Sequence, residues 1–120
     1  MITHIKFMGI PTRNQAAALT FWTEKVGFTL KTDQPMGDQR WIELTTPKGD
    51  TGLVLFTPPG HEDRVGTFVN ASLACDDVEA TYRQLSAKGV EFVDAPQKQP
   101  WGTFAKFKDP DGNVFVISSR

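Results

Sequence analysis

Side chains that could bind a metal ion or act as a nucleophile are scarce in this chain. Its 120 residues include two histidines, His4 and His61, and one cysteine, Cys75. Catalytic transition-metal sites use several imidazole, carboxylate or thiolate ligands, so a metal site here would need specific support from the sequence. We expect His61 to be solvated in a polar loop. We expect Cys75 to be a small buried apolar residue, since no cationic neighbour in the sequence would stabilise its thiolate.

Glu43 is the one carboxylate placed centrally in an expected strand. It stands two residues after Trp41, so the two side chains share one face of that strand. If this face lines a pocket, Glu43 is a candidate general base. The alternative is a solvated strand edge, since no second acid or histidine is placed to assist Glu43.

The charge balance excludes two classes of partner. Thirteen Lys and Arg residues stand against 14 Asp and Glu residues, which gives a formal net charge of -1 and a pI of about 6.1. This composition provides no basic field for nucleic acid or for an anionic membrane surface. No stretch approaches the ~20 apolar residues of a membrane span, and the amino-terminal segment lacks the apolar core of a secretory signal. With a lone cysteine that fits a reducing compartment, we expect a cytoplasmic protein.

The elements that must position these residues form a series that occurs twice. Alternation, helical spacing and turn residues predict the first series as a strand at 2–10, a helix at 15–26, and strands at 28–32, 41–45 and 52–57. Residues 58–66 are rich in Pro, Gly and charge and form a linker. The second series comprises a strand at 67–75, a helix after a capping box at Asp76 and Glu79, and strands at 90–93, 101–107 and 114–118.

Fixed separations between turn residues support an internal repeat. Pro47-Lys-Gly and Pro110-Asp-Gly lie 63 residues apart, and Gly27 and Gly89 end the two helices 62 residues apart. Trp41 and Trp101 are expected to begin equivalent strands. One module of ~55 residues cannot bury its own apolar face, so we expect a single domain over 1–120, made of module 1 (1–57), the linker and module 2 (67–120).

Two segments within this repeat resemble a known family. They are LTFWTEKVGF at 19–28, after the first strand, and DPDGNVFVI at 109–117, near the end of the chain. With the paired modules they resemble the vicinal oxygen chelate superfamily of glyoxalases, extradiol dioxygenases, fosfomycin-resistance enzymes and bleomycin-resistance proteins. The resemblance covers nearly the whole chain. It implies an α+β fold in which two βαβββ modules form a half-open, barrel-like sheet with the helices outside.

The resemblance also implies where a metal ion would be held. In the metal enzymes of this family, each module supplies one ligand from its first strand and one from its last strand. The matching positions are Phe7 and Asn70 on the first strands, Val116 on the last strand of module 2, and Leu53 or Leu55 on that of module 1. Phenylalanine, leucine and valine have no donor atom, so we expect no metal and no cofactor. A shift of one residue would substitute Met8, Val54, Ala71 or Ile117, which are no better.

Strand alternation identifies the residues expected on the concave face of the sheet. This face is apolar with a few polar groups, which is typical of a small-molecule pocket. The alternative is that side chains or a dimer partner fill the same space. The predicted ligand-binding residues are Phe7, Trp41, Leu53, Leu55, Asn70, Ser72, Trp101, Val116 and Ser118.

The resulting hypothesis is a metal-independent binding protein, closest in character to the metal-free bleomycin-resistance-like members, that sequesters an apolar or aromatic small molecule, as in antibiotic resistance. A metal-dependent lyase or dioxygenase is not expected from the apolar ligand positions. The alternatives are a glyoxalase-type enzyme, such as a lactoylglutathione lyase or a dioxygenase, with non-standard site residues, and a dimeric interaction scaffold with a filled pocket. Exposed sheet edges are usually covered and family members are commonly homodimers, so we expect a homodimer.

Overall fold

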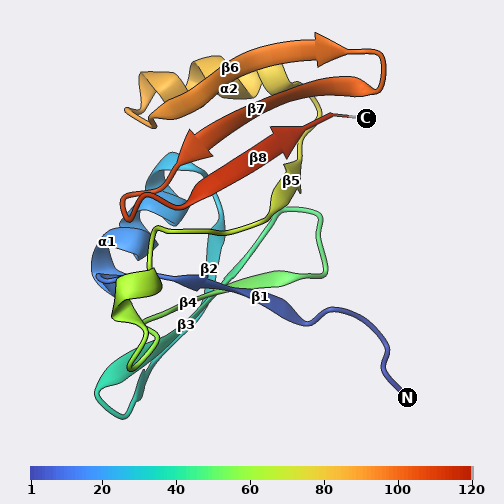
Figure 1. Cartoon of the computed structure of the whole chain (residues 1–120). Helices are drawn as coiled ribbons and strands as arrows, with labels where there is room; N and C mark the ends of the chain where they lie inside the picture. Colours follow the sequence, from blue (N-terminus) through green and yellow to red (C-terminus); the bar gives the residue numbers. More distant parts are fainter. Residues whose placement is uncertain (120) are drawn as a thin grey trace. The chain divides into compact units, whose positions relative to one another are not determined.

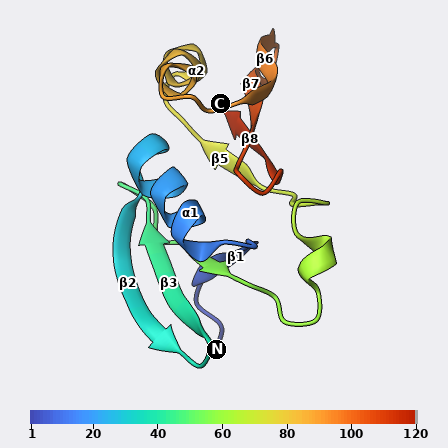
Figure 2. The ribbon, with the colours of Figure 1, turned by 90° about the vertical axis from the view of Figure 1, so that its left-hand side faces the viewer.

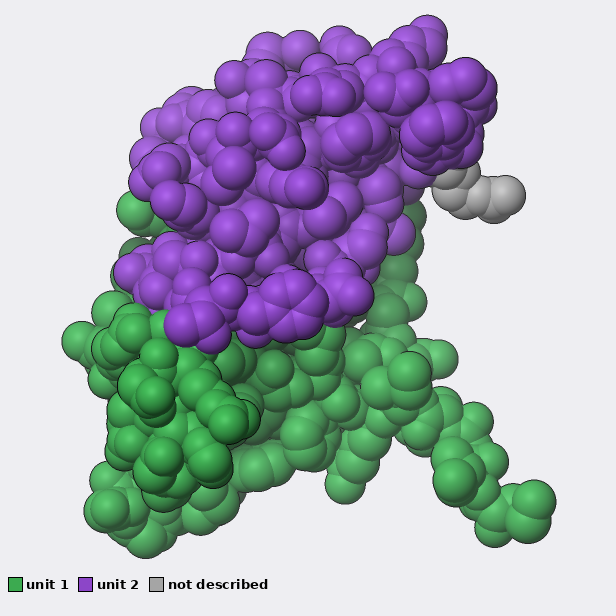
Figure 3. Space-filling view, in the orientation of Figure 1, with its two compact units in different colours: residues 1–65 green, residues 66–120 purple. Residues whose placement is uncertain are grey.

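The computed structural model describes residues 1–119 and contains two compact units, each with its own four-stranded sheet (Figure 1). Unit 1 is Met1–Val65 and unit 2 begins at Gly66; Figure 3 colours them green and purple. Among the described residues, no helix is both long enough and apolar enough to cross a membrane.

Both units follow the predicted order of elements. Unit 1 consists of β1 (Phe7–Pro11), α1 (Gln15–Thr20), a π-helical segment η1 (Phe21–Lys25), β2 (Thr29–Met36), β3 (Gln39–Thr45), β4 (Gly52–Phe56) and a 3₁₀ turn η2 (Glu62–Arg64). Unit 2 consists of β5 (Ser72–Ala74), α2 (Val78–Ala87), β6 (Phe92–Gln99), β7 (Gly102–Lys108) and β8 (Val114–Ser118). The α+β class and the two βαβββ modules are confirmed.

The strands form two separate sheets with the same order. In unit 1 this order is β1-β4-β3-β2, and in unit 2 it is β5-β8-β7-β6. The first strand of each unit pairs in parallel with the last strand, and the remaining pairs are antiparallel. Both first strands are shorter than predicted: β1 has five residues and β5 has three, and each pairs with a last strand of five residues.

The helix of unit 1 begins as predicted and ends in an unexpected way. The Asn14 side chain accepts a hydrogen bond from the Ala17 amide at 3.0 Å and caps α1. After Thr20 the pattern changes, since the Val26 amide donates to the Phe21 carbonyl, five residues earlier, at 3.1 Å. This spacing defines a π-helical turn. The helix ends at Gly27, whose φ is 95°.

The helix of unit 2 begins one residue later than predicted. Asp77, rather than Asp76, is the N-cap, and its side chain accepts a hydrogen bond from the Ala80 amide at 3.0 Å. The helix packs against β6 and β7 through the buried side chains of Val78 and Leu85.

One face of each sheet forms the core beneath its helix. In unit 1, α1 packs against β3 and β4 (Figure 2), and the buried residues on the helix side of this sheet are Ile10, Ile42, Leu44, Leu53 and Leu55. In unit 2, Phe107 and Phe115 stack with their ring centroids 5.6 Å apart, and Ala105 and Ile117 are also buried. Alternate residues of the same strands therefore point away from the helices. We call this side of each sheet its inner face, and it is the side on which a ligand site was predicted.

The Asp109-Pro-Asp-Gly-Asn turn is built around a buried carboxylate. Asp109 Oδ1 accepts hydrogen bonds from the amides of Asp111 (3.0 Å) and Asn113 (2.9 Å), and Oδ2 accepts one from Asn113 Nδ2 (2.9 Å). Asn113 Oδ1 in turn accepts a hydrogen bond from the Gly66 amide at 3.1 Å. The turn thus holds the first residue of unit 2. Burial raises the pKa of Asp109 above its ordinary value, although the hydrogen bonds from Asn113 act to lower it.

This raised pKa predicts how stability depends on pH. Folded protein binds a proton at Asp109 more readily than unfolded protein does, so this side chain favours folding as the pH falls through its raised pKa toward the ordinary range. We expect the free energy of unfolding of the native protein, relative to that of Asp109→Asn, to increase between neutral pH and about pH 4. Urea unfolding of both proteins measures this difference, and parallel pH profiles would contradict it.

Candidate functional site

Strand register decides which predicted site residues of unit 1 share a face. Phe7 pairs with Gly52, Gly9 pairs with Val54, and Val54 pairs with Glu43. Paired residues project to the same side of a sheet. The side chains of Phe7, Val54 and Glu43 therefore lie on one face, together with Trp41, two residues before Glu43. The rings of Phe7 and Trp41 meet edge to face, with their centroids 5.5 Å apart.

Leu53 and Leu55 do not lie on this face, which corrects the prediction. They pair with Met8 and Ile10, and their exposed fractions are 5% and 0%. Both belong to the core beneath α1. The turn before β4 differs in length from the turn before β8. Counting residues along the chain therefore could not decide which alternate residues of β4 point away from α1. The register places Val54 there instead.

Three of the predicted residues of unit 2, Ser72, Val116 and Ser118, share a face. Ser72 pairs with Val116, and Ala74 pairs with Ser118. The hydroxyls of Ser72 and Ser118 are hydrogen-bonded, with their Oγ atoms 3.0 Å apart. Val116 also pairs with Lys106 on β7, so the Lys106 side chain projects from the same face.

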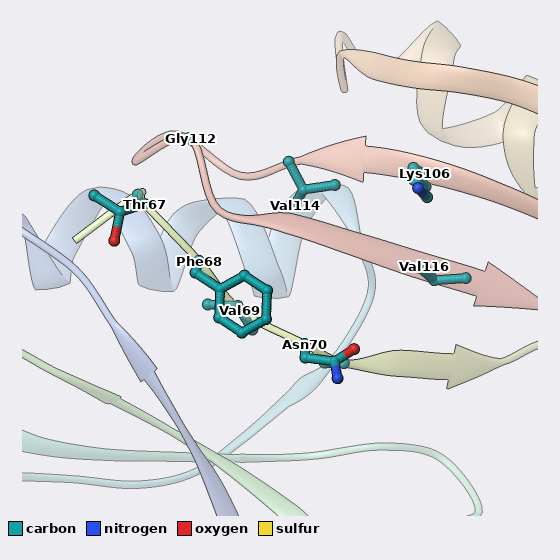
Figure 4. Close-up of a pocket in the computed structure, with 10 residues that line it drawn as sticks. Thr67, Phe68, Val69, Asn70, Lys106, Gly112, Val114 and Val116 are labelled. Atoms are coloured by element: carbon teal, nitrogen blue, oxygen red, sulfur yellow. The ribbon is translucent and has the colours of Figure 1, made fainter. Parts of the chain in front are cut away.

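A cavity of about 340 Å³ opens on this face of unit 2. Figure 4 shows Phe68 and Asn70 on the segment before β5, Val114 and Val116 on β8, and Lys106 on β7. Asn70 and Val116 were predicted as ligand-binding residues. Lys106 was missed, although the sequence contains a signal for it. Its neighbours Ala105 and Phe107 point toward the helix, so alternation places the lysine on the opposite face. The cavity is lined by Gly66, Thr67, Phe68, Val69, Asn70, Ala71, Lys106, Gly112, Val114 and Val116.

The register also identifies equivalent positions in the two units. Glu43 pairs with Thr32, and Lys106 pairs with Asp94. Thr32 and Asp94 each come directly after a shift in the pairing register of their strand. Glu43 and Lys106 are therefore equivalent residues of opposite charge. The duplicated faces have different chemistry, one carrying a carboxylate and the other an ammonium group.

Trp101 does not correspond to Trp41, contrary to the prediction. Phe104, two residues before Lys106, holds the position equivalent to Trp41. Trp101 lies in the turn between β6 and β7, before β7 begins, and is 74% exposed. The structure thus places Trp101 outside the residues that line the cavity.

The charged groups of the two faces differ in burial. Glu43 is 8% exposed, and its Oε2 atom lies 3.5 Å from Lys31 Nζ. Lys106 Nζ lies 3.7 Å from Asp94 Oδ2, and both side chains are about two-fifths exposed. Water weakens the second ion pair, so Lys106 can exchange Asp94 for another partner at little cost.

The residues at the implied metal positions do not fit a divalent ion. These positions hold Phe7, Val54, Asn70 and Val116, and only the Asn70 amide has a donor atom. Within residues 1–119, no group of three or more His, Cys, Asp or Glu side chains is close enough to hold a metal. His4 and His61 are exposed outside both faces, and Cys75 is half-buried.

Comparisons with known proteins agree with this geometry. The Glyoxalase/Bleomycin resistance protein/Dioxygenase superfamily profile matches residues 2–117. The YetH protein of Bacillus subtilis (strain 168) is 38% identical over 121 residues, which cover 98% of each chain. TnmS3, an antibiotic binding protein from Streptomyces sp. CB03234, has a TM-score of 0.89 and 37% identity, covering 98% of this chain and 96% of its own. A superfamily member from Sphaerobacter thermophilus DSM 20745 also has a TM-score of 0.89, with 29% identity over 99% of this chain and 98% of its own. The chain belongs to the glyoxalase/bleomycin resistance protein/dioxygenase superfamily.

Proposed function

We propose that this protein binds a small apolar or aromatic molecule, without a metal ion, in the cavity of unit 2. The observation that carries the proposal is the composition of the cavity wall. Phe68, Val114 and Val116 offer apolar surface, while Asn70 and Lys106 offer hydrogen-bond donors. A volume of about 340 Å³ lies within the range of small-molecule sites.

The exposure of Phe68 supports an apolar ligand. Its side chain is 79% exposed on a wall of the cavity. Covering ~100 Å² of such surface with a ligand would contribute about 2.5 kcal/mol. An aromatic ring could also stack against Phe68.

The likeness to TnmS3 supports the same class of ligand. TnmS3 is an antibiotic binding protein, and its likeness to this chain extends over 98% of the residues. We infer that an antibiotic or a related natural product with an aromatic system is the ligand class to test first.

Filling the cavity should abolish binding. We expect Val116→Trp to weaken the affinity for naphthylmethanol, a neutral aromatic probe, at least ~10-fold, because the indole would occupy space that the ligand needs. Met36→Trp is the matched control, since Met36 is exposed on β2 of unit 1 and does not line the cavity. Calorimetric titration measures both affinities, and melting curves verify folding. Equal affinity in Val116→Trp and native protein would reject this site.

Metal independence gives a second expectation. Protein purified without added metal should contain well below one equivalent of any transition metal, and EDTA should leave its melting temperature unchanged, because the inner faces lack a donor set. Elemental analysis and thermal unfolding test this. One equivalent of bound zinc or nickel per chain, together with a lower melting temperature in EDTA, would contradict it.

We also propose that the protein is a homodimer. Strands β1, β2, β5 and β6 each pair with one neighbour within the described residues, and strand edges of this kind are commonly covered by another chain. Ile5, two residues before β1 begins, is an exposed apolar side chain near one of these edges.

Light scattering on a sizing column should give twice the chain mass of 13.3 kDa. Ile5→Lys should shift the mass toward that of one chain, because an edge lysine opposes strand addition. Gln84→Lys, which adds the same charge to the exposed side of α2, should leave the mass unchanged. A mass of one chain for the native protein at every concentration would show that the proposal is wrong.

A further inference from the structure

We propose that Glu43 forms a recognition site for a protonated amine on the inner face of unit 1, and that the amine is carried by an aromatic group. This site lies on unit 1 and is separate from the cavity of unit 2. The inference rests on the proposed function only for the class of ligand, a small aromatic molecule, to which it adds a positive charge. It assigns Glu43 a binding role rather than the role of general base considered from the sequence.

The first argument is the burial of the carboxylate. Glu43 lies in the centre of β3 and is 8% exposed, so it has lost most of its hydration. A buried charge is costly unless another group replaces the water it has lost. A carboxylate can accept about four hydrogen bonds. Within residues 1–119, its recorded polar contact is the one between Oε2 and Lys31 Nζ at 3.5 Å, the outer limit of a hydrogen bond.

The second argument is the way in which Lys31 reaches Glu43. Leu30 pairs with Leu44 and Thr32 pairs with Glu43, so Lys31 is the extra residue of a β-bulge. Bulges redirect a side chain and often lie beside functional sites. The Lys31 side chain is 57% exposed and can leave at little cost. Its ammonium group therefore marks the place where the amine of a ligand would bind.

The same bulge in unit 2 has no cation. Phe92 pairs with Phe107 and Asp94 pairs with Lys106, so Val93 is the extra residue there. The fold thus does not require a lysine at the bulge. A lysine at the bulge occurs in unit 1, where the face carries the carboxylate of Glu43 and a cationic partner would stabilise it.

The third argument is the surface next to the carboxylate. Trp41 lies on the same face, two residues before Glu43, and Phe7 meets Trp41 edge to face. Gly52 leaves room for the carboxylate to lie close to the sheet, since a Cβ atom at Gly52 would lie 3.2 Å from Glu43 Oε2. Aromatic rings beside a carboxylate favour a cation attached to an apolar group. An anionic ligand would instead be repelled by Glu43.

Two probes that differ in charge test this assignment. Naphthylmethylamine is protonated at neutral pH, whereas naphthylmethanol is neutral and has nearly the same shape. We expect the native protein to bind the amine at least ~10-fold more tightly than the alcohol. Glu43→Gln should remove this preference and leave the affinity for the alcohol unchanged. Lys31→Met should strengthen amine binding several-fold, because the resident ammonium group no longer competes.

Matched controls separate local recognition from net charge. Asp33→Asn removes a carboxylate that pairs with Arg40 and belongs to the register pair with Ile42, on the opposite face. Lys98→Met removes an exposed lysine of unit 2. Neither change should alter the preference for the amine. Calorimetric titration gives all affinities, and circular dichroism verifies folding.

The outcomes distinguish this inference from the function on which it rests. Equal affinity for amine and alcohol, unchanged in Glu43→Gln, would overturn the assignment of Glu43 while leaving small-molecule binding intact. Binding of neither probe would overturn both. If Glu43→Gln does not fold, Lys31→Met decides, because amine binding no tighter than that of the native protein rejects the proposal and a several-fold gain supports it.

Discussion

The pairing of the first strand of each unit with its last strand is the constraint on which the arrangement of both faces depends. Side chains alternate along a strand, so a shift of one residue in the β1–β4 register would move the side chains that now form the core beneath α1 to the opposite face of the sheet. The observed register buries Leu53 and Leu55 beneath α1 and turns Val54 inward. It also decides that Glu43, rather than its neighbours Ile42 and Leu44, faces the inner side of the sheet. The chemistry of unit 1 therefore follows from one parallel pairing of five residues.

The internal duplication has kept the backbone and changed its chemistry. Each unit retains the strand order, a parallel outer pair and a bulge before the residue that pairs with the charged centre of the third strand. The centre is Glu43 in one unit and Lys106 in the other, so the two faces carry charges of opposite sign. At the four positions that the resemblance implies for metal ligands, the two faces carry Phe7, Val54, Asn70 and Val116, and only the Asn70 amide has a donor atom.

Local signals in the sequence were sufficient for most of the fold and for part of the site. Caps, glycine stops and alternation predicted both modules, and parity placed Ser72, Val116 and Ser118 on one face, as the register has them. The features that were missed depend on contacts between strands. The bulge at Lys31 and the parity of β4 are set by pairing partners, and the π-helical turn at Phe21–Lys25 shows no distinctive residue pattern. Trp101 was misplaced because the match of tryptophan to tryptophan ignored the true length of the hairpin.

The Asp109 turn has a consequence for the energetics of recognition. Residues 66–71 form the cavity wall before β5, and both ends of this segment are held by hydrogen bonds. The Gly66 amide donates to Asn113 at 3.1 Å, and the Ala71 carbonyl accepts from the Val116 amide at 3.0 Å. A wall fixed in this way loses little conformational entropy when a molecule settles against it, so more of the contact energy remains as affinity. The buried carboxylate beneath the turn thereby contributes preorganisation to a cavity that it does not line.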